Sequence, residues 1–150
     1  MRTGEERTRR RADARSHQIG AMEMGKANAV LNACAGLFGA SGVAAAAGAA
    51  HLAGGDRLNA VALILLAHAA ALLGLVSRAR PGEAGARLWL AASVIVTVGA
   101  ALFSADVALL TLRGARLFPM AAPTGGTLLI IGWLVASIAG ISGLFRATLP

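Results

Sequence analysis

Residues 27–55 read ANAVLNACAGLFGASGVAAAAGAAHLAGG and contain no Asp, Glu, Lys or Arg. Three more uncharged stretches follow at 58–77, 88–105 and 117–145. Each can hold about 20 helical residues, which at about 1.5 Å per residue cover the roughly 30 Å of a bilayer's hydrocarbon core. The 150-residue chain is 57% hydrophobic and 14% charged, with a mean hydropathy of +0.68, outside the usual range of a soluble domain. We therefore predict an all-α integral membrane protein, a four-helix bundle in the lipid bilayer.

The apolar stretches divide the chain into a tail and a membrane domain. We expect residues 1–26 to form a basic, flexible cytoplasmic tail and residues 27–146 to form the transmembrane domain. The expected helices cover about 27–50, 58–77, 88–110 and 125–146. Met22 and Met24 stay open as alternative natural starts, either of which would shorten the tail.

The net charge of +7 is unevenly distributed. Eleven of the 14 Lys and Arg residues lie before the first expected helix, between the second and third, or after the fourth; the others are Arg57, Arg113 and Arg116. Because basic loops stay on the cytoplasmic side, four helices place both termini in the cytoplasm. Aromatic residues make up 4% of the chain and Tyr is absent. The stacking platform of single-strand binders is therefore missing, and nucleic acid is not an expected partner.

Small residues recur four positions apart and predict close helix packing. In the first stretch Gly36 precedes Ala40 at this spacing. The stretch has so little bulk that we expect its helix in the bundle interior. The longest stripe is Gly132, Ala136 and Gly140 in the fourth helix. We expect this stripe to dock with a second copy or with other membrane protein subunits.

Asp106 lies within the third expected helix, about one turn before its end. A carboxylate within a span costs about 2.5–3.5 kcal/mol at mid-bilayer and less near the interface, so it should be paired or protonated. Arg113 follows seven residues later, roughly two turns along the same helix face, and its long side chain reaches back. The sequence leaves two interpretations open, a structural tether and a functional carboxylate.

His68 lies near the middle of the second expected helix, where an imidazole needs a hydrogen-bond partner or water. A backbone carbonyl, Ser93 or Thr97 is the expected partner, and a proton relay is the alternative. His51 ends the first helix beside a Gly-rich turn and is a further polar candidate.

Pro123, Gly125 and Gly126 form an unusual loop at the start of the fourth expected helix. Proline suits a helix start, and two glycines allow close backbone approach. Free N–H groups at this end would suit an anion, and a tight loop packed on the bundle is the alternative.

No pattern in the chain predicts enzyme chemistry. The three His residues are scattered without the spacing of metal ligands, and Cys34 is the sole cysteine. We therefore expect no metal, no cofactor and no catalytic residues.

Several short motifs together resemble the small bacterial membrane family called domain of unknown function 423. They are Ala49-Ala50-His51, Ala67-His68, Leu102-Phe103-Ser104, Pro123-Thr124-Gly125-Gly126 and Gly132-Trp133. The chain departs from the family pattern at several positions, among them Asp106, where the family has Ser. The resemblance implies a four-helix inner-membrane protein over about 27–145 and implies no activity.

Two functions from different classes follow from these features. The first is a structural or interaction unit that docks with itself or with a larger membrane complex. The alternative is a minimal proton- or solute-permeation unit that uses His68 and Asp106.

Overall fold

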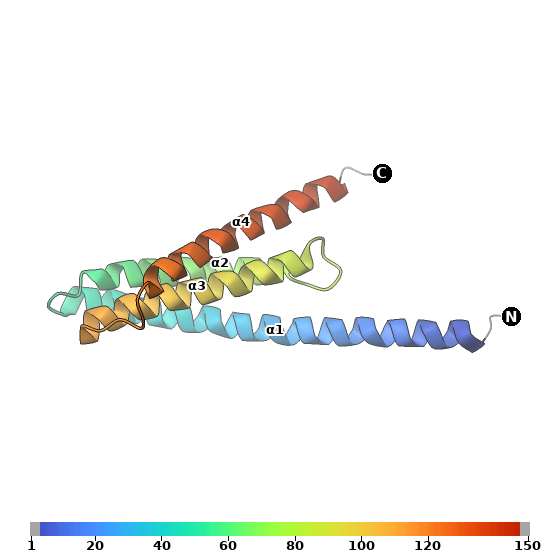
Figure 1. Ribbon diagram of the computed structural model, residues 1–150, viewed down its shortest axis with the longest axis horizontal. Helices are drawn as coiled ribbons and strands as arrows, with labels where there is room; N and C mark the ends of the chain where they lie inside the picture. Colours follow the sequence, from blue (N-terminus) through green and yellow to red (C-terminus); the bar gives the residue numbers. More distant parts are fainter. Residues whose placement is uncertain (1–3, 148–150) are drawn as a thin grey trace.

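The computed structural model describes residues 4–147 and their side chains from residue 9 to residue 143. In this range the chain forms four helices, α1 (Gly4–His51), α2 (Arg57–Arg78), α3 (Ala86–Arg113) and α4 (Ala121–Ala147). The helices run alternately in opposite directions, so the first and last described residues lie toward the same end of the molecule (Figure 1). Each helix is long and apolar enough to cross a membrane. The expected all-helical chain with four such helices is confirmed.

The helices pack in chain order. Helix α1 packs on α2, α2 packs on α3, and α3 packs on α4, whereas α1 meets α3 only marginally. The central core therefore surrounds α3, where Ala92, Val96 and Ala100 are fully buried. Helices α1 and α4 form the two edges, and each leaves one long face without a neighbour.

Helix α1 begins at Gly4 and not near Ala27. It runs without a break through the basic segment that we expected to be a flexible tail, and it extends beyond the other three helices (Figure 1). Residues 4–26 contain no proline and are rich in Arg, Glu, Ala and Met, which favour helix. Lys26 also pairs with Glu23 at 2.9 Å, one turn apart.

The prediction that the first helix lies in the bundle interior is wrong. Leu37 and Val43 of α1 are 66% and 62% exposed, and a Cβ added to Gly36 would meet nothing within 4 Å. Small side chains permit close approach to a neighbour, but they do not determine which helix lies between two others. The interior position belongs to α3, because both α2 and α4 pack extensively on it.

The closest helix contact joins α3 and α4 at their glycines. A Cβ added to Gly125 would lie 2.5 Å from the Phe103 backbone N, and one added to Gly132 would lie 2.6 Å from a Val96 side-chain carbon. Ala136 is 5% exposed, and a Cβ on Gly140 would contact Trp89. The stripe expected to dock with a partner therefore packs within the chain, against α3.

Candidate functional site

Asp106 is fully buried near the end of α3 and is held by the loop that follows it. Its carboxylate accepts hydrogen bonds from the Leu117 backbone N–H at 2.9 Å and from Arg116 Nη1 at 3.2 Å. The arginine side chain is 53% exposed, so the pair joins a buried anion to a cation at the surface. These two hydrogen bonds attach the loop before α4 to the end of α3, and we call them the latch.

The partner of Asp106 is Arg116, and the expected partner, Arg113, is exposed and does not bond to it. Helix α3 ends at Arg113 because Gly114 adopts the left-handed conformation, with φ 67°, and closes the helix. The chain then folds back, which brings Arg116 and Leu117 over the carboxylate. His51 is exposed at the end of α1 and makes no bond to Asp106.

His68 bridges α2 and α4. Its Nδ1 lies 2.7 Å from the Ile64 carbonyl oxygen, and Trp133 Nε1–H donates to its Nε2 at 3.3 Å. Because Nε2 accepts, Nδ1 carries the proton that the carbonyl accepts, which describes a neutral imidazole. A backbone carbonyl was among the expected partners. Ser93 and Thr97, the other two, instead donate to carbonyls of their own helix.

The Trp133 contact was missed in the sequence. Its signal was an indole N–H in an apolar stretch, which needs an acceptor when buried. The pair is a direct polar link between α2 and α4. His68 and Asp106 thus bond to different elements, and the geometry of the described residues does not assemble them into one site.

The loop that we expected at the start of the fourth helix is the first part of α4 itself, because the helix begins at Ala121. Proline is tolerated in a first helical turn. The Ala121 and Thr124 N–H groups bond to the carbonyls of Phe118 and Met120, so they are not free for an anion. Gly125 packs on Phe103, and Gly126 has open space around it.

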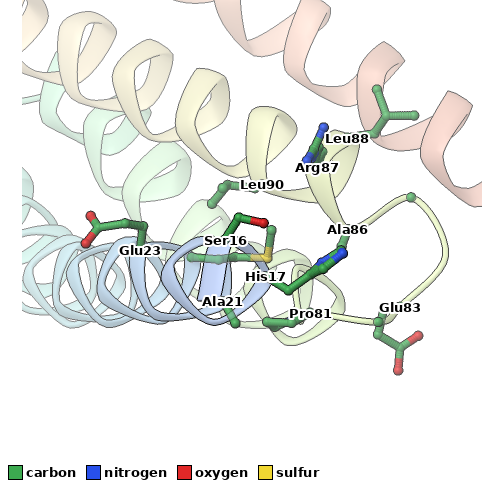
Figure 2. Close-up of a pocket in the computed structure, with 14 residues that line it drawn as sticks. Ser16, His17, Ala21, Glu23, Pro81, Glu83, Ala86, Arg87, Leu88 and Leu90 are labelled. Carbon is green, nitrogen blue, oxygen red and sulfur yellow. The ribbon is translucent and has the colours of Figure 1, made fainter. Parts of the chain in front are cut away.

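A polar hollow of about 900 Å³ lies where the N-terminal part of α1 passes the connection between α2 and α3. Figure 2 shows Ser16 and His17 of α1 on one side and Arg87 of α3 on the other. Glu83 adds a negative charge. These four side chains are exposed, so both signs of charge face solvent at this end of the molecule.

The outward face of α1 carries small residues and one amide, a feature missed in the sequence. Its exposed members recur at spacings of three and four and are Ala29, Asn32, Ala33, Gly36, Ala40, Val43, Ala47 and Ala50. Asn32 makes no hydrogen bond within the described residues, whereas Asn28, one turn earlier, donates to the Ala79 carbonyl at 2.6 Å. An asparagine within an apolar stretch was the signal for this face.

The family model described as "Protein of unknown function (DUF423)" matches residues 35–126. The matched range contains His68, Asp106 and Gly125 and ends before Trp133. No curated protein and no solved structure matches the chain significantly.

Proposed function

The chain belongs to the DUF423 family of proteins of unknown function, and on this premise we propose that it is a membrane interaction unit that docks with a second copy of itself. In this proposal the four helices cross a bacterial inner membrane, and both termini lie in the cytoplasm. The excess of Lys and Arg at the ends and in the α2–α3 connection supports that orientation. The N-terminal part of α1 then projects from the membrane, since 48 residues span about 72 Å.

The observation that carries the proposal is the outward face of α1. Lipid chains are as apolar as leucine, so a helix face gains from a protein neighbour chiefly through close packing and hydrogen bonds. Of the residues that make up this face only Val43 is bulkier than Asn, and the exposed Val30 and Leu37 border the face on one side. Another helix can approach such a surface closely, and dispersion contacts then stabilise the pair.

Asn32 supports a second copy as the partner. Its amide needs a donor and an acceptor in an apolar medium, and an identical amide supplies both. Two copies insert in the same orientation, so a twofold axis parallel to α1 places the two Asn32 side chains at the same depth. A single buried asparagine fixes the register of parallel helix pairs in this manner.

Cysteine cross-linking in native membranes tests the proposal. In a Cys34→Ser background, single cysteines are placed at Gly36 and Ala40 on α1, and at Leu134 and Ile138 on the exposed face of α4 as matched controls. We expect oxidation to give a dimer from the α1 positions and little from the α4 positions. A cross-linked product whose mass is not that of a dimer would mean that the partner on this face is a different protein.

The variant Asn32→Ala separates the amide from the small surface. Interhelical hydrogen bonds in membranes contribute about 0.6–2 kcal/mol, so we expect self-association about threefold to thirtyfold weaker, with the fold intact. Equal cross-linking from both helices, or none from α1, would refute docking through this face.

A further inference from the structure

A cavity of about 490 Å³ lies between α1 and α3, with α2 as its floor. It exists because α1 and α3 lie on either side of α2 and meet only marginally. Its walls are mostly apolar, and many of its lining residues are alanine or glycine. Cavities of this size hold single small ligands.

The cavity is elongated along the helices. On α3 it extends from Ala101, near the middle of the helix, to Leu112 at its end. On α1 it extends from Phe38 to Leu52. Eleven residues of helix correspond to about 17 Å, close to half of a bilayer's hydrocarbon core. The space therefore fits a chain that lies in one leaflet.

Two hydroxyl groups lie near the mid-membrane end of this cavity and have no partner. Ser104 is 4% exposed, and its Oγ is buried without a hydrogen bond. By contrast, Ser93, Thr97 and Thr111 on the same helix each donate to the carbonyl four residues earlier. Ser41, on the α1 wall, also makes no hydrogen bond within the described residues.

We propose that this cavity binds a lipophilic carbonyl compound of the quinone type. Ser104 Oγ is closed to solvent in this structure, so its side chain turns about the Cα–Cβ bond to donate to the ligand's carbonyl oxygen. Ser41, which is exposed on the α1 wall, is a second donor. The hydrocarbon tail lies along the alanine-rich walls. Phe38 lines the same end and offers an apolar ring surface to the head of the ligand. A buried hydroxyl without a partner costs about 1–3 kcal/mol, and a carbonyl placed there removes that cost.

A phospholipid fits less well. Its charged headgroup stays at the membrane surface, so the end of its acyl chain would lie beside the two serines and offer no acceptor. The site therefore distinguishes molecules that carry oxygen deep in the membrane from plain hydrocarbon chains. It is separate from the docking face of α1, because none of its lining residues belongs to that face.

Equilibrium binding to the purified full chain in lipid nanodiscs tests the site, with decylbenzoquinone and decylbenzene as matched probes. We expect the quinone to bind more tightly than the hydrocarbon. The double variant Ser41→Ala/Ser104→Ala should weaken quinone binding about tenfold and leave decylbenzene binding unchanged. Ser137→Ala, which removes an exposed hydroxyl of α4, is the control and should change neither.

A variant that fills the cavity provides a second test. Ala105→Phe should abolish binding of both probes, and its helical circular dichroism and size-exclusion profile report whether it folds. Equal affinity of the two probes, or full quinone binding by the double serine variant, overturns the proposal and leaves a groove for hydrocarbon only. If the folded Ala105→Phe variant still binds the quinone, the binding site is not this cavity.

Discussion

The two edge helices, α1 and α4, differ in which side chains they pack on a neighbouring helix and which they expose. Helix α4 packs its glycines tightly on α3 and presents bulky residues outward, among them Ile130, Leu134, Ile138 and Ile141. Helix α1 also packs Gly42 and Gly48 on α2, but it presents a second set of small residues outward, beside the exposed Val30 and Leu37. It leaves a cavity between itself and α3. In lipid, bulky aliphatic side chains are stable against acyl chains, whereas a small surface gains from another helix.

The difference teaches that a small-residue stripe indicates close packing without identifying the partner. The stripe of α4 is satisfied within the chain, because Val96 and Trp89 of α3 pack against it. The stripe of α1 has no partner within the described residues. An exposed, unsatisfied stripe is therefore the stronger indication of an intermolecular contact than the longest stripe in the sequence.

The largest effect should come from adding bulk where α4 packs on α3, in contrast to adding it on the outward face of α1. Gly125→Leu places its Cβ against the Phe103 backbone, which cannot move aside as a side chain can, so we expect a loss of at least about 3 kcal/mol in the free energy of unfolding or failure to fold. Gly36→Leu meets open space and should leave the unfolding of the monomer unchanged. Unfolding in mixed micelles, followed by circular dichroism, measures both.

Equal destabilisation by the two substitutions would show that Gly125 and Gly36 do not differ in how closely they are packed. The comparison is matched, because each variant introduces the same side chain into a helix.

A smaller effect should follow from opening the latch at the start of α4. Asp106→Ala leaves the Leu117 N–H without its acceptor and removes the charge-assisted bond from Arg116, so we expect a loss of about 1.5–3 kcal/mol in the free energy of unfolding. We expect no larger loss in the free energy of unfolding, because the Arg116 side chain is half exposed and is hydrated when the carboxylate is removed.

Arg113→Ala is the control for the latch, since it removes a nearby cation that does not bond to Asp106. The same unfolding measurement should give no change. If Arg113→Ala costs as much as Asp106→Ala, the pairing described for this loop is wrong.

The smallest effects should come from single neutral hydrogen bonds that attach the edge helices. Trp133→Phe removes the bond from α4 to His68, and Asn28→Ala removes the bond from α1 to the Ala79 carbonyl. We expect each to lower the free energy of unfolding by about 1 kcal/mol. The Trp133→Phe variant keeps most of the ring packing, so its loss reports the N–H group.

Amide hydrogen exchange gives each of these two variants a local readout. Faster exchange should be confined to the edge helix whose bond was removed. A uniform increase over all four helices would mean that the edges do not open separately from the core.

The sequence by itself determined the number and type of the elements and the family. Apolar stretches of about 20 residues leave helix as the structure that satisfies their backbone in a bilayer. The motifs from Ala49 to Gly126 identified the family, and the need of His68 for a hydrogen-bond partner followed from its position in an apolar stretch. These conclusions depend on local composition, which is read directly from the chain.

Only the tertiary structure decided which helix lies inside and which polar groups meet. The sequence suggested Arg113 as the partner of Asp106, but Gly114 ends the helix and the chain reversal brings Arg116 there instead. The Trp133 indole meets His68 only because α4 packs beside α2 at this point. Likewise, Gly36 and Gly132 carry the same local signal, and the packing order alone makes one exposed and the other close to Val96. Each outcome depends on groups far apart in sequence, which helical periodicity does not relate to one another.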